Sequence, residues 1–569
     1  MKRKRGIMAV IQKTLGYIMA AASGYYRKKF EKDTLQAVEV NQLVLKKILN
    51  LNKTSEYGRK YQFSSIISPS DYKEKVPLTS YEDYRPYLER MANGEENILT
   101  SLPVIYFGLS SGTTGESKLI PVTALSRKVI NSHMMLLTEG MLRQAVPGAR
   151  YGSRGMMIMN GVKTGVTAGG IPTGAGTSGG MNSMRHIIPY LWTSPPEVMQ
   201  LTDQPTAIYL HLLFALQEKD LAYINAPFPA PILQLFHTLE EQWPHLKRDL
   251  AEGGISRHLN LEPEIRNQLV KRLRPDAGRA EQLEKEIKKG AAGIACRLWP
   301  KLLYICCVAG GSFSIYMDKL RRYTGQIPVY SAVYSATEAM LGICTGINDV
   351  TYVITPRTAY HEFIPVDETE SSNPTVLGMD ELEKDKSYEV VITNQAGLYR
   401  YRLGDVVKVA GYYNNSPVVE FLYRKGQLLN LTGEKTQEKA VLAALKNAAK
   451  HWDRDLVDYT TAVDVNGPFG RYVIFVEVRN PEKATDITAW QAILQKALEK
   501  ANPRYRAAVE ARRIEGLLLQ LVQPGTFHRL QRELMLRGAS ANQVKIPRVL
   551  KDKSLINFLS ESTLKVGNC

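Results

Sequence analysis

The sequence has little cysteine and no long apolar run. No segment approaches the roughly 20 apolar residues that a membrane-spanning helix needs, and this excludes an integral membrane protein. The cysteines form an odd set without Cys-x-x-Cys spacing, which excludes a zinc ribbon and a disulfide framework: they are Cys296, Cys306, Cys307, Cys344 and Cys569. We therefore expect free thiols in a reducing compartment, with Cys306 and Cys307 packed as small apolar residues.

The sequence also lacks a dense basic stripe interleaved with aromatic residues, although its net charge is +17. Eight basic residues precede the first acidic one, Glu31, and supply +8 of that charge: Lys2, Arg3, Lys4, Arg5, Lys13, Arg27, Lys28 and Lys29. The remaining +9 is spread over the rest of the chain. We therefore expect no nucleic-acid partner.

The first 30 residues read as a basic amphipathic helix. Gln12 and Lys13 interrupt the apolar content that a signal peptide would need. The apolar residues instead recur at helical spacing: Ile7, Ile11, Leu15, Ile18 and Ala22. Such a helix docks on its own domain or rests weakly on an anionic membrane surface, and we favour docking.

A hydroxyl-rich and glycine-rich loop lies between two strand-like segments, Val104 to Phe107 and Leu119 to Val122. Glycine and hydroxyl residues bring amide and hydroxyl donors close to an anion: Ser110, Ser111, Gly112, Thr113 and Thr114. The loop fails the Walker pattern, because Lys118 does not follow a glycine and no helix follows directly. It predicts phosphate binding, and a plain hairpin turn is the alternative.

A compact α/β unit follows the helical region 210–295. Leu302 to Val308 and Pro328 to Val333 read as parallel strands, and Phe313 to Tyr323 reads as the helix between them. Ligands bind beyond the carboxyl ends of such strands. That position holds Tyr334, Ser335, Ala336, Thr337, Glu338 and Ala339, whose hydroxyls and carboxylate suit a nucleotide and its magnesium ion.

A third segment, 397–407, reads as a strand with Gly404 and Asp405 at its centre. Aspartate is disfavoured inside strands, so its presence needs a reason. One reason is that its carboxylate accepts both hydroxyls of a ribose, and an ordinary turn aspartate is the alternative.

The pattern as a whole predicts an α/β protein in three parts. Residues 1–30 form the basic helix. Residues 31–430 form a large domain of several subdomains with parallel and mixed sheets. Residues 431–569 form a small α+β domain, because alternating strand and helix patterns follow the polar break at 430–436.

These segments together resemble the auxin-responsive Gretchen Hagen family of acyl acid amido synthetases, a branch of the adenylate-forming enzymes. Five motifs stand in the order of that family. They are the phosphate loop with its Ile-Pro tail, Tyr-x-x-Thr-Glu at 334–338, Tyr-Arg-x-Gly-Asp-Val at 401–406, Glu-Lys-Thr at 434–436 and Asn-Gln-x-Lys-x-Pro-Arg at 542–548.

The resemblance implies an activity and a set of roles. An organic acid attacks the α-phosphate of ATP, pyrophosphate leaves, and an amino acid then displaces AMP to form an amide. The phosphate-loop residues would hold the phosphates, Thr337 and Glu338 the phosphate and Mg²⁺, and Tyr334 with Ser335 the adenine. Asp405 would hold the ribose, Lys545 would reach the reacting phosphate from a mobile small domain, and Lys435 would steady the hinge.

Two rival functions remain open from the sequence. One keeps the adenylate and passes the acyl group to coenzyme A or a carrier thiol. The other is a non-catalytic membrane or nucleic-acid adaptor. For the ligase we expect ATP and Mg²⁺, a monomer and a cytoplasmic location. Arg127 and Arg143 are candidates to bind the acid, with solvated arginines as the favoured reading.

Overall fold

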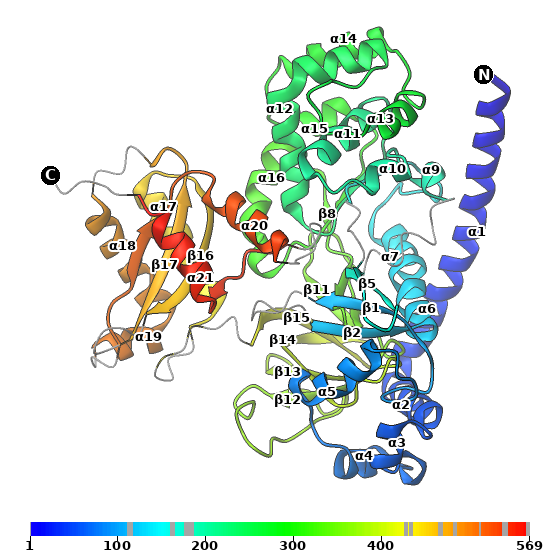
Figure 1. Ribbon diagram of the computed structural model, residues 1–569, viewed down its shortest axis with the longest axis vertical. Coiled ribbons are helices and arrows are strands. Elements are labelled where there is room, and N and C mark those ends of the chain that lie inside the picture. Colours follow the sequence, from blue (N-terminus) through cyan, green and yellow to red (C-terminus); the bar gives the residue numbers. More distant parts are fainter. Residues whose placement is uncertain are drawn as a thin grey trace. The chain divides into compact units, whose positions relative to one another are not determined.

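A computed structural model describes residues 2–110, 118–159, 165–175, 187–425, 429, 431, 436–464, 470–481, 486–510, 514–537 and 544–564. The chain divides into two compact units (Figure 1). Unit 1 holds Met1–Ser110, Leu119–Leu403 and Val407–Phe421. Unit 2 holds Ser111–Lys118, Gly404–Val406 and Leu422–Cys569, and each unit is described separately below.

Three sheets organise unit 1. The first has the strand order β2-β1-β5-β4 and contains β1 (Val104–Ser110), β2 (Lys118–Thr123), β4 (Gly165–Val166) and β5 (Pro172–Ala175). The second is wholly parallel, in the order β3-β6-β7-β8, from β3 (Gly155–Met157), β6 (Tyr223–Asn225), β7 (Tyr304–Cys306) and β8 (Val329–Tyr330). The third has the order β12-β13-β14-β15-β11-β10-β9. Its strands are β9 (Val333–Ser335), β10 (Met340–Ile343), β11 (Thr351–Ile354), β12 (Tyr360–Pro365), β13 (Ser387–Thr393), β14 (Tyr401–Tyr413) and β15 (Ser416–Arg424).

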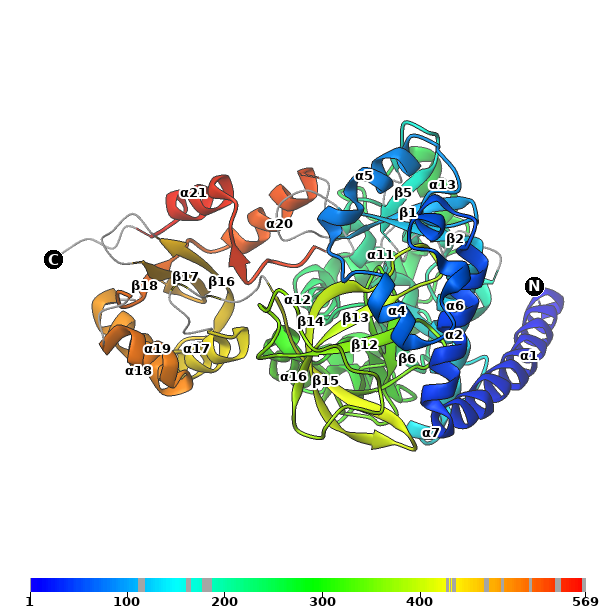
Figure 2. The ribbon, with the colours of Figure 1, turned by 90° about the horizontal axis from the view of Figure 1, so that it is seen from below.

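Helices from the first part of the chain cover one flank of unit 1 (Figure 2). They are α1 (Lys2–Leu35), α2 (Ala37–Asn52), α3 (Glu56–Lys60), η1 (Phe63–Ser65), α4 (Pro69–Lys75), α5 (Tyr81–Ala92), α6 (Ala124–Ser132), η2 (His133–Leu137) and α7 (Thr138–Ala145). The last turns of α1 lie against η2 and α7, so tightly that a Cβ on Gly140 would meet the Ser23 carbonyl oxygen at 2.8 Å. The first turns of α1 project beyond these contacts in Figures 1 and 2.

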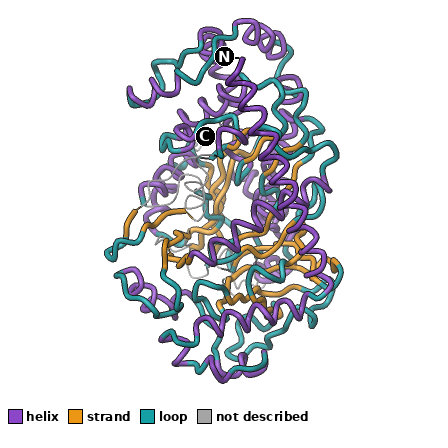
Figure 3. The backbone as a smooth tube through the Cα atoms, turned by 90° about the vertical axis from the view of Figure 1, so that its right-hand side faces the viewer, coloured by secondary structure: helices purple, strands orange, loops and turns teal. Residues whose placement is uncertain are grey.

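A helical subdomain packs on the parallel sheet and fills one end of unit 1 (Figure 3). It contains α9 (Ile188–Leu191), α10 (Pro196–Met199), α11 (Gln204–Leu216), α12 (Pro229–Glu252), α13 (Pro263–Val270), α14 (Ala277–Ile287), α15 (Ile294–Leu298), η4 (Gly311–Tyr316) and α16 (Met317–Thr324). Helix α11 is apolar on every side and is buried from Thr206 to Leu216, as expected of a central helix. The Asp203 carboxylate caps it by accepting from the Thr206 amide at 3.0 Å.

Unit 2 is a small α+β domain. Its sheet has the order β18-β17-β16-β19 and contains β16 (Leu456–Asp464), β17 (Arg471–Val478), β18 (Leu518–Leu521) and β19 (Val549–Leu550). Its helices are α17 (Glu438–Trp452), α18 (Ile487–Ala501), α19 (Pro503–Glu510), α20 (Thr526–Leu536) and α21 (Lys553–Glu561). Its core includes Phe475, Leu530 and Leu559, which are fully shielded from solvent.

The structure confirms the α/β class with a large N-terminal part and a small α+β part. The phosphate loop does join strand to strand, and Thr123 caps the helix that follows, since its hydroxyl accepts from the Ser126 amide at 3.1 Å. That helix, α6, continues through a π-helical turn, η2, into α7.

One expected strand is divided. Pro328 to Val333 forms β8 in the parallel sheet and the start of β9 in the antiparallel sheet. The segment that was expected beyond the carboxyl end of a parallel strand, Tyr334 to Ala339, therefore belongs to an antiparallel hairpin. Hydrophobicity alone did not reveal this break, because both short strands are apolar.

Candidate functional site

The hairpin between β9 and β10 holds four of the candidate residues. Its turn closes where the Ala336 amide donates to the Ala339 carbonyl at 2.8 Å. Tyr334 is 8% exposed and packs against the rings of Tyr352 and Phe421, with centroids 5.8 and 5.9 Å away. The hairpin therefore presents a flat aromatic ring fixed by two others.

The other three candidate residues of this hairpin differ from one another in solvent exposure. Ser335 is exposed and its hydroxyl reaches the carbonyls of Ala336 and Ala339, while Thr337 is half-buried. Glu338 is buried, at 7% exposure. A buried carboxylate in a turn needs supporting contacts.

Asn394 is a supporting residue that sequence reasoning missed. Its Nδ2 donates to the Glu338 carbonyl at 2.8 Å, and its Oδ1 accepts from the amides of Ala396 and Leu398. It therefore ties the hairpin to the connection between β13 and β14. The signal Asn-x-Ala-Gly at 394–397 predicts a turn, but a contact across 56 residues has no local signature.

The phosphate loop is described only at its edges. Ser110 ends β1, and Lys118 begins β2. Ser111, Gly112, Thr113 and Thr114 lie outside the described residues, as does Lys435. Their roles stay predictions.

Asp405 lies in β14 within unit 2 and is 2% exposed. Gly404 before it has φ +78°, a conformation that L side chains rarely adopt, and its carbonyl accepts from the Lys425 amide at 2.6 Å. Glycine is thus required for the backbone shape that presents Asp405. The Arg424 Nε donates to Asp405 Oδ1 at 2.5 Å, a charge-assisted pair within unit 2.

Lys545 lies in the same unit, close enough to sense Asp405 and Arg424 electrostatically. The residue is exposed to solvent. Desolvation, followed by repulsion from Arg424, lowers the pKa of Lys545 to about 8, and Asp405 and Glu438 oppose the shift. A perturbed pKa at a charged cluster is a mark of functional sites.

Arg548 anchors the segment that carries Lys545. Its Nη1 donates to Asp458 Oδ1 at 2.5 Å and to the Tyr459 carbonyl, and its guanidinium stacks on the Tyr459 ring at 4.6 Å. The Glu438 carboxylate lies 3.7 Å from its Nε. All three ionic side chains are under 10% exposed, so this network holds the backbone three residues from Lys545 in place.

Two other basic candidates prove not to be solvated. Arg143 pairs with Glu139 at 2.5 Å and stacks on Tyr151 at 4.6 Å, and burial raises the pKa of Glu139. Arg127 lies over the Tyr106 ring at 5.2 Å, and desolvation lowers its pKa. The reading of both as solvated arginines is wrong, because aromatic rings shield them.

Within the described ranges, no group of three or more His, Cys, Asp and Glu side chains is arranged to hold a metal ion. None of the described helices combines the length and apolar content of a bilayer crossing. The four described cysteines are free thiols, and burial raises the pKa of Cys306 and Cys307.

Comparison with models of known families identifies the family of this chain. Models of the GH3 family match it in order: the N-terminal domain at 26–329, the central domain at 352–424 and the C-terminal domain at 439–554. The chain belongs to the GH3 family, and the expected resemblance is confirmed.

Full-length relatives carry names that agree with this assignment. The chain is 31% identical to indole-3-acetic acid-amido synthetase GH3.6 of Arabidopsis thaliana, over 93% of this chain and 91% of that protein. It is 30% identical to jasmonoyl–L-amino acid synthetase JAR4 of Nicotiana attenuata, over 95% of this chain and 96% of that protein.

Solved structures extend the likeness to the fold. The acyl acid amido synthetase GH3.15, solved in complex with 2,4-DB, is 26% identical with a TM-score of 0.81, and the match covers 95% of this chain and 96% of that chain. A 2-hydroxyisobutyryl-CoA ligase in its postadenylation state has a TM-score of 0.52 at 11% identity, over 94% of this chain and 91% of that chain. The latter likeness shows the adenylate-forming fold alone.

Proposed function

We propose that this chain is an ATP-dependent acyl acid amido synthetase. One observation carries the proposal: three GH3 domains match in order from residue 26 to 554, and full-length relatives are named as amido synthetases. The enzyme couples a small organic acid to an amino acid. It first forms an acyl adenylate and releases pyrophosphate, and the amine then displaces AMP.

Electrostatics explains how Lys545 serves this reaction. When the carboxylate attacks the α-phosphate, negative charge grows on the phosphate oxygens, and a fixed cation stabilises it. An ammonium whose pKa is about 8 remains largely charged at neutral pH. Arg548 supports this role by holding the adjoining backbone.

Asp405 suits the ribose because a buried carboxylate accepts two hydroxyl donors. The Arg424 contact orients this carboxylate. Tyr334 offers its ring to the adenine, with Ser335 beside it, and the phosphate-loop residues Ser110 to Thr114 hold the phosphates. Lys435 steadies the hinge before the small domain, residues 431–569, which closes for adenylation and swings for amide formation.

Mg²⁺ fits a site with few protein ligands. This ion usually binds through one or two carboxylates together with substrate phosphates. Glu338 with Thr337 therefore supplies enough protein ligands. The absence of a larger acidic cluster in the described ranges is compatible with such a site. When bound, the ion neutralises phosphate charge during adenylate formation.

A panel of acids crossed with amines tests the proposal. The protein is incubated with ATP, Mg²⁺, each acid and either an amino acid or coenzyme A, and AMP, amide and free thiol are measured. Amide formation with thiol untouched supports the proposal. Thioester without amide would instead establish the acyl-CoA rival, and no acid-dependent AMP release with any acceptor contradicts both.

The same substrates suggest where and how the protein works. ATP and amino acids are abundant in the cytoplasm, and the free thiols favour a reducing compartment. We infer a cytoplasmic enzyme that acts as a monomer on small molecules, with at most a weak membrane contact through residues 1–30.

A further inference from the structure

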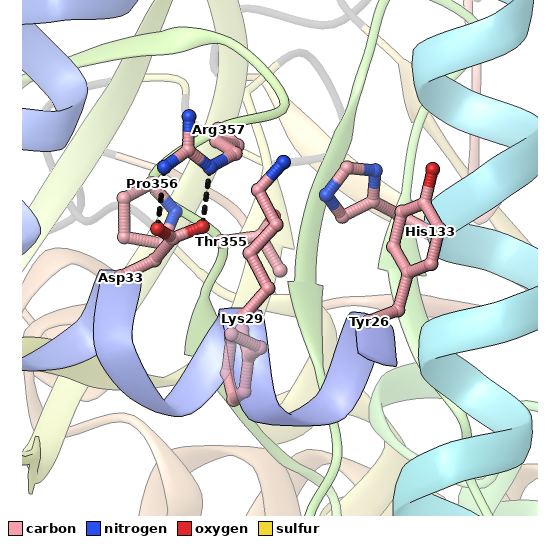
Figure 4. Close-up of a pocket in the computed structure, with 8 residues that line it drawn as sticks. Tyr26, Lys29, Asp33, His133, Thr355, Pro356 and Arg357 are labelled. Carbon is pink, nitrogen blue, oxygen red and sulfur yellow. Dashed lines mark hydrogen bonds and ion pairs between the residues drawn. The ribbon is translucent and has the colours of Figure 1, made fainter. Parts of the chain in front are cut away.

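A hollow in unit 1 lies outside all the residues assigned to adenylation (Figure 4). Helix α1 contributes Tyr26, Lys29, Phe30 and Asp33, the π-turn η2 contributes His133, and the connection after β11 contributes residues 355–357. The empty space amounts to about 240 Å³ with its open mouth included. Most of this space lies at the open mouth rather than in an enclosed cavity, so the hollow suits a small ion held at its rim.

The carboxylate that lines the hollow, that of Asp33, is already paired with an arginine. Asp33 is 6% exposed, and both of its carboxylate oxygens accept from Arg357. The Nη2–Oδ1 distance is 2.6 Å, and Nε donates to the other oxygen. Arg357 therefore neutralises Asp33 and still has the two N–H donors of Nη1, which make no hydrogen bond within the described part of the chain.

Lys29 brings a second positive charge, which no described carboxylate pairs with. Its side chain extends between Arg357 and His133 (Figure 4). Among the described residues it has no hydrogen bond and no ion pair. The residue is half-buried.

His133 is the third nitrogen-bearing side chain of the hollow, and its Nε2 becomes a hydrogen-bond donor when it is protonated. Its Nδ1 donates to the Val129 carbonyl at 2.7 Å, which leaves Nε2 unprotonated in the neutral ring. Burial lowers the pKa of His133 and the hydrogen bond to Val129 raises it, while Lys29 and Arg357 lower it and Asp33 raises it. The Tyr26 ring meets the imidazole edge-on, with centroids 5.6 Å apart.

We propose that this hollow is a binding site for a small tetrahedral oxyanion, namely inorganic phosphate or a phosphate monoester. Lys29 supplies a point charge, Arg357 Nη1 supplies two directed donors, and His133 Nε2 supplies a third once the anion favours its protonation. The anion offsets the surplus positive charge that Lys29 brings to the hollow.

The occupant would join three separate parts of unit 1. It would bridge α1, the π-turn that continues α6, and the connection between β11 and β12. Helix α6, which Thr123 caps, directly follows β2. Anion binding would therefore clamp α1 onto the helical segment that continues from β2.

Calorimetric titration of inorganic phosphate into the full chain, at pH 6.5 and low salt, tests the site. Saturable binding is expected, and Lys29→Met should weaken it about tenfold or more, the scale for losing one charge-assisted contact. Lys28→Met is the matched control, because it removes the same charge from the neighbouring, exposed position and should bind as the parent does. Equal binding in parent and Lys29→Met would mean that phosphate binds elsewhere, and this outcome overturns the proposal.

A second measurement follows His133 itself. Phosphate should raise the pKa of His133 in an NMR titration of the imidazole in the full chain, and Lys29→Met should abolish that response while Lys28→Met keeps it. An unchanged His133 titration at saturating phosphate overturns the proposal even where calorimetry shows heat.

Vesicles distinguish a lipid headgroup from the free anion. Co-sedimentation with phosphatidic-acid vesicles that is lost in Lys29→Met, retained in Lys28→Met and competed by free phosphate assigns a phosphomonoester lipid to the hollow. Failure to co-sediment, with the phosphate titration intact, assigns the free anion. Failure of both experiments refutes the site.

Discussion

Arg400 in unit 1 and Lys545 in unit 2 carry the same charge in two different settings. Arg400 is 4% exposed, and its Nε donates to both oxygens of Glu362 at 3.2 Å while Nη1 donates to two backbone carbonyls. Lys545 keeps an exposed side chain near another cation, Arg424, and its pKa falls to about 8. A cation that is saturated by a carboxylate and by carbonyl groups builds the fold, whereas a solvent-exposed cation beside another cation suits the proposed chemistry.

The largest effect on stability should come from breaking the saturated pair. Arg400→Met leaves the fully buried Glu362 carboxylate without its partner, which costs about 3–5 kcal/mol. Urea denaturation followed by tryptophan fluorescence measures the loss. Because burial already raises the pKa of Glu362, its protonation should make the loss smaller at pH 5 than at pH 7.

Glu362→Leu combined with Arg400→Met serves as the control. It removes both charges, so it should recover much of the stability lost in the single variant. A single variant as stable as the parent would show that the pair contributes little.

The largest effect on catalysis should come from Lys545. Lys545→Ala is expected to lower acid-dependent pyrophosphate exchange by about two to three powers of ten, the scale for one preorganised charge-stabilising group. The thermal midpoint should stay close to that of the parent, because the side chain is exposed. Lys551→Ala, an exposed lysine of the same unit, should retain full exchange, and undiminished exchange in Lys545→Ala contradicts the assignment.

Asp405 should affect nucleotide binding more than the chemical step. Asp405→Asn keeps the size of the side chain but removes the charge, so ATP affinity should fall about tenfold to a hundredfold. Isothermal titration with ATP measures this directly. A matched variant, Asp385→Asn, removes an exposed aspartate elsewhere and should leave ATP affinity unchanged; equal affinity in both variants would refute the ribose role.

The pH profile gives the smallest and most specific effect. Lys545 has a lowered pKa, so it is charged below about pH 8 and loses its proton above. The kcat/KM for adenylation, which reports groups of the free enzyme, should fall about tenfold between pH 8 and 9. Lys545→Arg keeps its charge in this range and should remove that alkaline limb; an identical limb in both proteins would assign it to another group.

Several elements were predictable because their signals are local. The cap at Thr123, the helix 438–450, the strand 472–478 and the strand around Asp405 follow from capping chemistry and from hydrophobic period. The family order of the motifs was equally visible. The division of 328–333 between two sheets was not, since a strand pattern does not say which neighbour it pairs with.

The sequence by itself determined the class of protein, the order of its motifs and the residue types that the proposed reaction uses. Only the tertiary structure decided that Asn394 supports the Glu338 turn, that Arg548 anchors the Lys545 segment and that α1 meets His133 and Arg357. The physical reason is that burial and electrostatic balance depend on partners distant in the chain. A lysine or an arginine acquires its pKa, and therefore its role, from those partners.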